Sequence, residues 1–277
     1  MGQLYVVATP IGNLEDISPR ALDSLARADA IAAEDTRVTA RLLEHHRVRA
    51  KLIAVHEHNE RQSAERIIEE LARGKTVALV TDAGTPGISD PGGVVVAKAR
   101  AAGFRVIPIP GPNAAVTALS AAGLRDGPFL FLGFLPAKAA ARRKALADLR
   151  SLPYALVFYE APHRIVECVE DMCSVLGAER ELVLARELTK IFEEIHRCRL
   201  GEAAEWLRGN PDRQRGEFVL MVEAAGAEPP GVDWEPMLAA LLEELPLARA
   251  VKLVCKITGA KRNAVYGRAL ALRGAKG

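Results

Sequence analysis

Short runs of apolar and β-branched residues alternate with amphipathic helical segments through the first half of this 277-residue chain. Such alternation is typical of an α/β layer structure. Because 49% of the residues are hydrophobic, a chain of this length can bury a substantial core in two globular domains. The strands expected in this half lie at residues 4–8, 52–55, 77–81, 106–109 and 129–132.

The second half of the chain continues the α/β pattern but with a different order of elements. A strand at 154–159 precedes a helix at 162–176. Three further apolar runs with polar flanks, at 182–185, 192–200 and 218–222, indicate that this half contains a mixed sheet.

Changes of composition place the expected boundaries between domains. Residues 226–233 contain two prolines followed by glycine and form a linker by composition. Beyond it, Gly259 divides the end of the chain into two short helices, which is the outline of a helix-turn-helix. We expect an N-terminal α/β domain at 1–136, a basic helix and hinge at 137–153, a C-terminal α/β domain at 154–225 and a basic helical region at 234–277.

The distribution of charge is uneven along the chain. Residues 246–277 carry eight Lys or Arg and no Asp or Glu, so this segment has a charge of +8. The 245 residues before it carry 29 basic and 35 acidic residues, a net charge of −6. A basic block on an acidic body indicates contact with a polyanion away from the main site, although a solvated helix surface is the simpler alternative.

No run of residues approaches the roughly 18 apolar residues that a membrane-spanning helix needs. We therefore expect a cytoplasmic protein that does not bind a membrane. The four cysteines match neither the spacing of zinc pairs nor a disulfide framework, so buried thiols are expected.

Four loops that follow expected strands are rich in glycine, proline and small residues, at 9–13, 82–92, 110–114 and 159–164. In open parallel sheets, ligands bind where such loops meet at the carboxyl ends of strands. Glycine lets a ligand approach the backbone and proline limits the entropy lost when the loop is ordered, so a rigid pocket made largely of main chain is predicted.

Two nucleotide-binding motifs that the sequence lacks limit what the pocket is expected to bind. Neither a GxGxxG sequence after the first strand nor a GxxxxGK[ST] sequence is present, which argues against a phosphate-binding nucleotide fold. Asp82, beside exposed backbone groups, suits a ligand with hydroxyl or ammonium groups. A structural Asx-turn explains Asp82 equally well.

Seven segments together resemble the motifs of the bacterial small-subunit ribosomal RNA cytidine 2′-O-methyltransferases, a family of the tetrapyrrole-methylase superfamily. The resemblance implies a two-domain tetrapyrrole-methylase-like fold with S-adenosylmethionine held in the cleft between the domains. It also implies a homodimer and a target in the decoding region of the small ribosomal subunit, in 16S rRNA. The segments are 8–14, 33–37, 82–92, 110–114, 159–164, 186–190 and 216–218.

The same resemblance assigns residues to the cofactor pocket. The sulfonium supplies an activated methyl group, so we expect no metal. His56 and His58 could imitate a metal pair on a strand, but no third ligand converges on them. The assigned pocket residues are Pro10, Gly12, Asp82, Gly84, Thr85, Pro86, Ala114, Ala115, Tyr159, Glu160, Ala161, Glu217 and Phe218.

Methyl transfer from sulfur to oxygen is an in-line displacement, so positioning of the acceptor is the main requirement. A base must also take up the hydroxyl proton, or a cation must steady the developing charge on oxygen. With carboxylates nearby, Lys190 is expected to stay charged and to steady the oxygen or a phosphate. Glu187 or Glu160 is then the candidate proton acceptor, and an edge strand with surface charges is the alternative interpretation.

RNA binding is expected on two basic segments. In the carboxyl-terminal region the alternative is a small helical cap used for packing. Aromatic residues make up only 5% of the chain, so a platform for stacking bases is not evident. The expected RNA contacts are Arg142, Arg143 and Lys144 on the basic helix, Arg164 at a helix start, and Lys256, Lys261, Arg262 and Arg268 near the helix-turn-helix.

Two other functions compete with ribose methylation. The chain could methylate a small molecule such as a tetrapyrrole, which would not need the basic tail. It could instead be a non-catalytic rRNA-binding assembly factor, which would not need an intact cofactor cleft. The sequence has both features and therefore favours an enzyme that methylates RNA.

Overall fold

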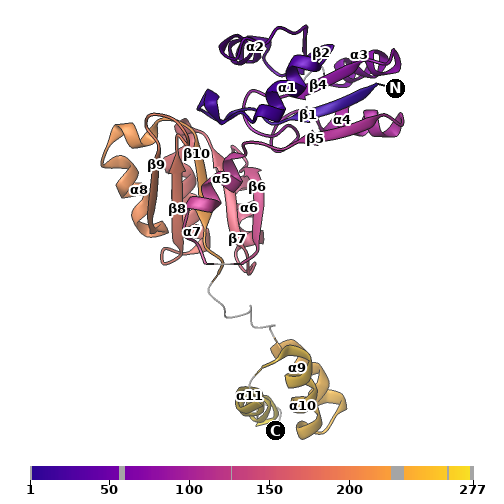
Figure 1. The fold of residues 1–277 in the computed structure, drawn as a ribbon. Helices are drawn as coiled ribbons and strands as arrows, with labels where there is room; N and C mark the ends of the chain where they lie inside the picture. Colours follow the sequence, from indigo (N-terminus) through magenta and orange to yellow (C-terminus); the bar gives the residue numbers. More distant parts are fainter. Residues whose placement is uncertain (1, 56–59, 126, 226–233, 261, 275–277) are drawn as a thin grey trace. The chain divides into compact units, whose positions relative to one another are not determined.

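The structure is a computed structural model that describes residues 2–55, 60–125, 127–225, 234–260 and 262–274 (Figure 1). The expected linker at 226–233, the histidines at 56 and 58 and the basic residue Lys261 lie outside the described residues. Contacts divide the chain into two compact units. The first consists of Met1–Asp148 and Tyr154–Glu223, and the second of Leu149–Pro153 and Ala224–Gly277.

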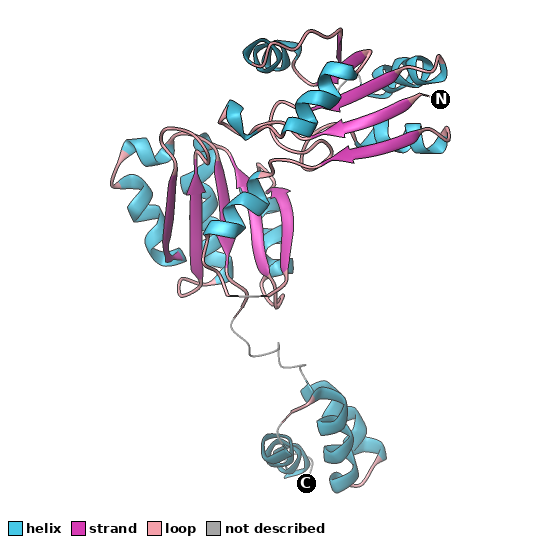
Figure 2. Ribbon diagram, viewed as in Figure 1, coloured by secondary structure: helices cyan, strands magenta, loops and turns pink. Residues whose placement is uncertain are grey.

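The first unit begins with a five-stranded parallel sheet in the order β3-β2-β4-β1-β5. Strands are drawn in magenta in Figure 2. A parallel sheet must be covered on both faces. Alternate side chains of β1 point to opposite faces of the sheet and pack into the core on each side. Val7 packs with α1 and α2, while Leu4 packs with α3 and α4 on the opposite face. The elements are β1 (Gln3–Val7), η1 (Leu14–Asp16), α1 (Pro19–Arg27), β2 (Ala30–Ala33), α2 (Thr36–His45), β3 (Leu52–Ala54), α3 (Glu60–Ala72), β4 (Thr76–Val80), α4 (Gly93–Ala101) and β5 (Arg105–Ile109).

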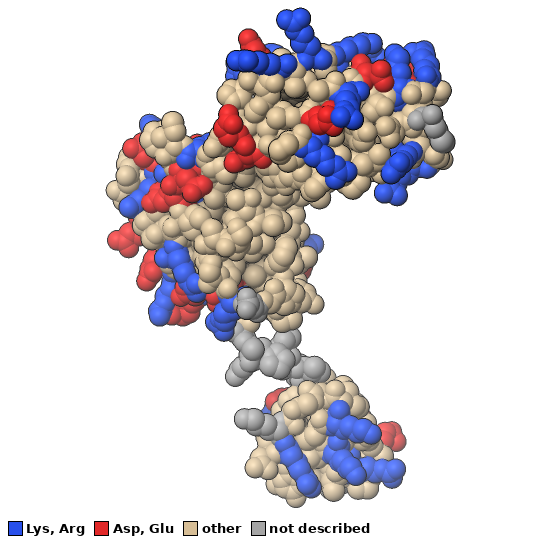
Figure 3. All heavy atoms as spheres, in the orientation of Figure 1, with Lys and Arg blue, Asp and Glu red and all other residues tan. Residues whose placement is uncertain are grey.

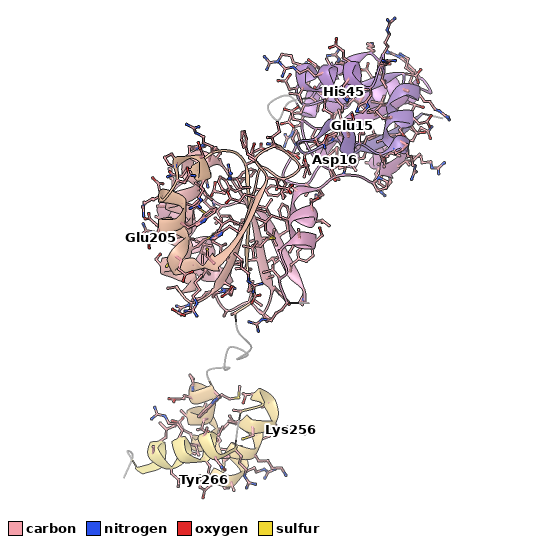
Figure 4. All side chains as sticks on the ribbon, turned by 60° about the vertical axis from the view of Figure 1, so that its left-hand side comes forward. Glu15, Asp16, His45, Glu205, Lys256 and Tyr266 are labelled. Atoms are coloured by element: carbon pink, nitrogen blue, oxygen red, sulfur yellow. The ribbon has the colours of Figure 1, made fainter. Side chains whose placement is uncertain are left out.

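One helix start and one helix end in this part show the local reasons for the fold. The Ser18 hydroxyl accepts a hydrogen bond from Ala21 N–H at 3.1 Å, and Pro19 occupies the first helical position of α1. At the far end of α2, His45 Nε2 lies 2.8 Å from Glu15 Oε1 of η1, a pairing that can be followed in Figure 4. The segment after β1 is thus tied to a neighbouring helix.

The second sheet of the same unit is mixed, in the order β6-β7-β10-β8-β9, as the sequence predicted. Only β6 and β7 are parallel, and the other pairs are antiparallel. Ala115 and Ala118 of α5 pack in one core with Val157 of β7, Val183 of β8 and Val219 of β10. The elements are α5 (Ala114–Ala121), β6 (Phe129–Phe134), α6 (Ala139–Leu149), β7 (Ala155–Glu160), η3 (Pro162–Arg164), α7 (Ile165–Leu176), β8 (Glu181–Arg186), β9 (Glu194–Arg199), α8 (Leu200–Arg208), η4 (Pro211–Gln214) and β10 (Phe218–Val222).

The second unit contains three helices, α9 (Trp234–Glu244), α10 (Leu247–Thr258) and α11 (Arg262–Gly274). Their apolar faces meet in a small core of their own, formed by residues such as Leu238, Val254 and Val265. Gly259 ends α10 with φ of 71°, a left-handed conformation that glycine adopts without strain. The expected two-sheet α/β fold with a helix-turn-helix region is confirmed.

No helix in the described part of the chain is long and apolar enough to cross a membrane.

The basic helix predicted at 137–153 forms as α6, but its charges are placed differently from the expectation. Arg142 is only 1% exposed, and its Nε donates to Asp171 Oδ2 of α7 at 2.6 Å. Arg143, more exposed, donates to the other oxygen of Asp171 at 2.7 Å. The prediction that Arg142 contacts RNA is therefore wrong, because its guanidinium fastens α6 to α7 inside the unit.

Replacing Asp171 by Ala should lower the free energy of unfolding by about 3 kcal/mol, because the buried Arg142 guanidinium would lose its carboxylate partner. Urea denaturation followed by circular dichroism measures this change. Asp212→Ala is the matched control, since Asp212 pairs with Arg215 at the surface and such pairs contribute about 0–1 kcal/mol. Equal losses in the two variants would contradict the structural role given to Asp171.

Candidate active site at the ends of the strands

Loops from both sheets of the first unit line one cavity of about 270 Å³. The loops after β1, β4 and β5 contribute one side of the lining, and the ends of β6 and β7 contribute another. The segment after β8 and the start of β10 complete it. The cavity therefore lies where glycine- and proline-rich loops were predicted to meet at strand ends.

Main-chain hydrogen bonds hold three of these loops together. Thr9 and Gly84 exchange two backbone bonds of 2.9 and 3.0 Å, which join the loops after β1 and β4. The Thr85 hydroxyl donates to Pro112 O at 3.1 Å and joins the third loop. Gly84 adopts φ of 81°, so a side chain here would strain the backbone where it borders the cavity.

The structure brings eight of the predicted cofactor residues to the cavity wall, and five others lie outside it. Of these five, Asp82 accepts a hydrogen bond from Asp35 N–H at 2.9 Å, and Ala115 N–H donates to the Tyr159 hydroxyl at 3.2 Å. The eight are Gly84, Thr85, Ala114, Tyr159, Glu160, Ala161, Glu217 and Phe218. The five are Pro10, Gly12, Asp82, Pro86 and Ala115, and the cofactor role of all thirteen stays a prediction.

Gly12 lies against the segment after β8. A Cβ atom at this position would come within 2.6 Å of the Lys190 Cγ atom and 2.9 Å of Leu188 O. Asn13 N–H also donates to the Thr189 hydroxyl at 3.0 Å. The loop after β1 and the loop after β8 are therefore in direct contact.

Asp90 is an acidic group of the cavity that the sequence reasoning did not select, although it lies within the predicted loop at 82–92. Burial raises the pKa of the Asp90 carboxyl to about 7, and the negative charges of Glu34, Asp82 and Glu217 raise it further. Its place after a strand was visible in the sequence, but the crowding of acidic groups around it was not. A cationic ligand would relieve this repulsion.

Lys190 joins two carboxylates at the cavity wall. Its Nζ lies 2.9 Å from Glu187 Oε1 and 2.9 Å from Glu217 Oε2. Partial burial acts to lower the pKa of Lys190, but hydrogen bonds from Nζ to Glu187 and Glu217 outweigh it and raise the pKa. Lys190 is therefore a cation at neutral pH, as the sequence predicted.

Glu187 is a weak candidate for a proton acceptor. Although burial opposes its charge, the hydrogen bonds from Lys190 Nζ and Glu217 N–H lower the pKa of Glu187. It does not line the cavity, and it adopts φ of 51°. Its carboxylate instead holds the loop after β8 against the start of β10.

Glu160, at the end of β7, does line the cavity and is 2% exposed. Its Oε1 accepts Ala161 N–H at 2.8 Å, and its Oε2 accepts from Arg164 Nη2 at 3.2 Å. Arg164 also donates to Leu135 O at 2.7 Å. The Arg164 guanidinium therefore orients Glu160, and its expected contact with RNA stays a prediction.

Basic side chains are exposed on the helical unit, where the sequence predicted RNA contacts. Lys256 lies on α10 and Arg262 on α11, both exposed, and Figure 3 shows several basic and few acidic side chains on the visible face of this unit. Figure 4 marks Lys256 and Tyr266 on these two helices. Arg268 pairs with Glu235 Oε2 at 2.7 Å, so part of its charge is already balanced. On α6, Lys144 is also exposed.

Sequence comparisons match both units to known families. The profile described as Tetrapyrrole (Corrin/Porphyrin) Methylases matches residues 3–204, and the profile described as RsmI C-terminal HTH domain matches residues 228–273. Ribosomal RNA small subunit methyltransferase I of Escherichia coli O157:H7 is 50% identical over 275 residues, covering 99% of this chain and 96% of that protein. The protein of the same name from Pseudomonas aeruginosa is 50% identical over 277 residues, covering 99% and 98%.

Solved structures show a similar fold at low sequence identity. The methyltransferase CobJ aligns with a TM-score of 0.62 and 21% identity, over 81% of this chain and 95% of that one. A uroporphyrin-III C-methyl transferase from Thermus thermophilus, solved in complex with S-adenyl homocysteine, aligns with a TM-score of 0.57 and 19% identity, over 80% and 97%. These likenesses support the two-sheet fold.

The pKa of Asp90 makes ligand binding depend on pH. As the pH falls from 8 to 6, the Asp90 carboxyl takes up a proton and loses the charge that attracts a cation, so binding should weaken several-fold. Calorimetric titration with S-adenosylmethionine, the donor implied by the sequence resemblance, measures this directly. Asp90→Asn should bind weakly with a flatter pH dependence, and an unchanged slope in that variant would assign the titration to another group.

Proposed function

The chain belongs to the tetrapyrrole methylase family, and from this premise we propose that it transfers a methyl group from S-adenosylmethionine to the 2′-hydroxyl of a cytidine in small-subunit ribosomal RNA. One observation carries the proposal. This chain is about half identical, along almost its whole length, to proteins named ribosomal RNA small subunit methyltransferase I, and it has an acidic cavity at its strand ends.

The cavity suits S-adenosylmethionine. When bound, this cofactor supplies a methyl group on a positively charged sulfur, which needs no further activation. Acidic groups at Asp90, Glu160 and Glu217 line the cavity and favour a cation. Gly84 and Ala114 present backbone without bulky side chains, so a nucleoside can approach the main chain there.

Two residues of the wall have the chemistry that the transfer requires. The charged Lys190 can steady the ribose oxygen as it loses its proton, or bind the neighbouring phosphate. Glu160 is the better placed of the two candidate proton acceptors, because it lines the cavity and Glu187 does not. Arg164 pairs with Glu160 and positions its carboxylate.

The helical unit is the proposed binding surface for RNA. Its exposed lysines and arginines would attract the phosphates of 16S rRNA around the decoding region. A tetrapyrrole methylase acting on a small molecule has no use for such a surface, and an assembly factor without catalysis has no use for the acidic cavity. Both features together favour the RNA methyltransferase.

We also propose that the protein acts in the cytoplasm as a homodimer. Strand β6 lies at the edge of its sheet and exposes Phe129 by 49% and Leu132 by 37%. An apolar edge strand of this kind invites pairing with another chain. A second copy packed on β6 would cover these side chains.

Transfer of labelled methyl groups tests the proposed function. The chain is incubated with S-adenosylmethionine carrying a labelled methyl group and with isolated small subunits, free small-subunit rRNA or uroporphyrinogen. Label on a cytidine ribose of the rRNA is the expected result. Label on the macrocycle would contradict it, and tight RNA binding without label would favour the assembly factor.

Replacing Lys190 by Met should lower the rate of transfer to rRNA at least tenfold, since the cation beside the acceptor is lost. The dissociation constant for S-adenosylmethionine, measured by calorimetry, should change less than threefold. Lys51→Met, at an exposed position before β3, is the control for loss of one positive charge. A parallel loss of cofactor affinity in the Lys190 variant would make Lys190 part of the cofactor site instead.

A further inference from the structure

Two large apolar side chains protrude from the loop between β8 and β9. Ile191 is 95% exposed and Phe192 is 71% exposed. They occupy the two central positions of a turn closed by Glu193 N–H donating to Lys190 O at 3.1 Å. Such positions usually hold Gly, Pro, Asn, Asp or Ser, so neither residue is explained by the needs of the turn.

The loop that carries this apolar tip, defined as Ile191 and Phe192, is tightly hydrogen-bonded. A preceding turn is closed by Lys190 N–H donating to Glu187 O at 3.0 Å. Thr189 N–H donates to Glu193 Oε2 at 2.6 Å. Thr189 has φ of 65°, a conformation that a β-branched residue adopts only when its surroundings enforce it. The tip is thus held in place before anything binds to it.

The apolar tip begins one residue after the wall of the active site. Leu188 and Lys190 both line the cavity, and consecutive Cα atoms are about 3.8 Å apart, so Phe192 stands within roughly 8 Å of Lys190 along the backbone. The Thr189 hydroxyl accepts Asn13 N–H, which fastens the loop to the opposite side of the site. A substrate held at Lys190 would therefore have the tip only one or two residues away along the chain.

The proposed substrate explains why apolar groups stand at this place. Proteins that recognise RNA bind bases out of the helix and stack them on aromatic side chains. A base–aromatic stack tolerates any base, because every base has a π face. We propose, in an inference that rests on the proposed function, that Phe192 stacks on an RNA base beside the target nucleotide. This stack, flanked by Ile191, positions the target ribose at the cavity.

A contact with a second copy of the chain accounts for the tip less well. Two side chains bury far less than the roughly 800 Å² per partner of a stable interface. The tip is bordered by the charged Lys190 and Glu193, and the edge strand β6 offers a longer apolar row. In RNA a phosphate lies next to each base. The Lys190 cation can bind such a phosphate while the neighbouring Phe192 ring stacks on the base.

Four variants test the proposal by single-turnover methylation of small subunits at saturating labelled S-adenosylmethionine. Phe192→Ala should lower kcat/KM for the subunits by roughly five- to a hundredfold, the effect of losing one base stack. Phe192→Leu, which keeps apolar bulk without a ring, should be nearly as impaired, while Phe192→Trp should stay within about threefold of wild type. Tyr154→Ala, which removes a 38% exposed ring before β7, is the control and should be unaffected.

Two further measurements distinguish base stacking from a role in cofactor binding or in self-association. The dissociation constant for S-adenosylmethionine and the oligomeric state from sedimentation should be the same in all variants. Full activity of Phe192→Ala, full rescue by Leu, loss of cofactor binding, or dissociation of an oligomer would each overturn the proposal. A wild-type chain that labels no rRNA would overturn the proposed function as well, whereas normal labelling by both wild type and Phe192→Ala would overturn only the role of Phe192.

Discussion

The wall of the candidate active site depends on the contact of the loop after β8 with the start of β10 and with the loop after β1. Glu187 Oε1 accepts Glu217 N–H at 3.0 Å, and the Thr189 hydroxyl accepts Asn13 N–H at 3.0 Å. The ion pairs of Lys190 with Glu187 and Glu217 fix the position of the cation at this wall. The apolar tip is held by the turns of the same loop, so its position depends on this contact too.

Much of the fold could be predicted from the sequence because its cause is local. Glycine and proline in the loops after β1, β4, β5 and β7 were sufficient to predict where the cavity lies, since strand ends in such sheets converge. Strand β2 was missed because Ala30–Ala33 is mostly alanine, which favours helices. Burial of all four residues between β3 and β4 makes it a strand.

The side-chain partners could not be predicted because they come from distant parts of the chain. Arg142 and Arg164 looked like free charges on helices, but Asp171 and Glu160 bind them. Phe192 was expected to begin a strand at 192–200. The strand begins at Glu194 instead, and the ring projects from a turn. The low aromatic content gave no sign that one exposed ring would stand beside the site.

A crystal structure of the chain with S-adenosylhomocysteine and a short RNA containing the target cytidine would test the central claim most directly. We expect the cofactor product in the cavity between Gly84, Glu160 and Phe218, with the target ribose oxygen beside Lys190. A cofactor product bound outside this cavity, or a ribose that approaches from a side remote from Lys190, would contradict the proposed mechanism.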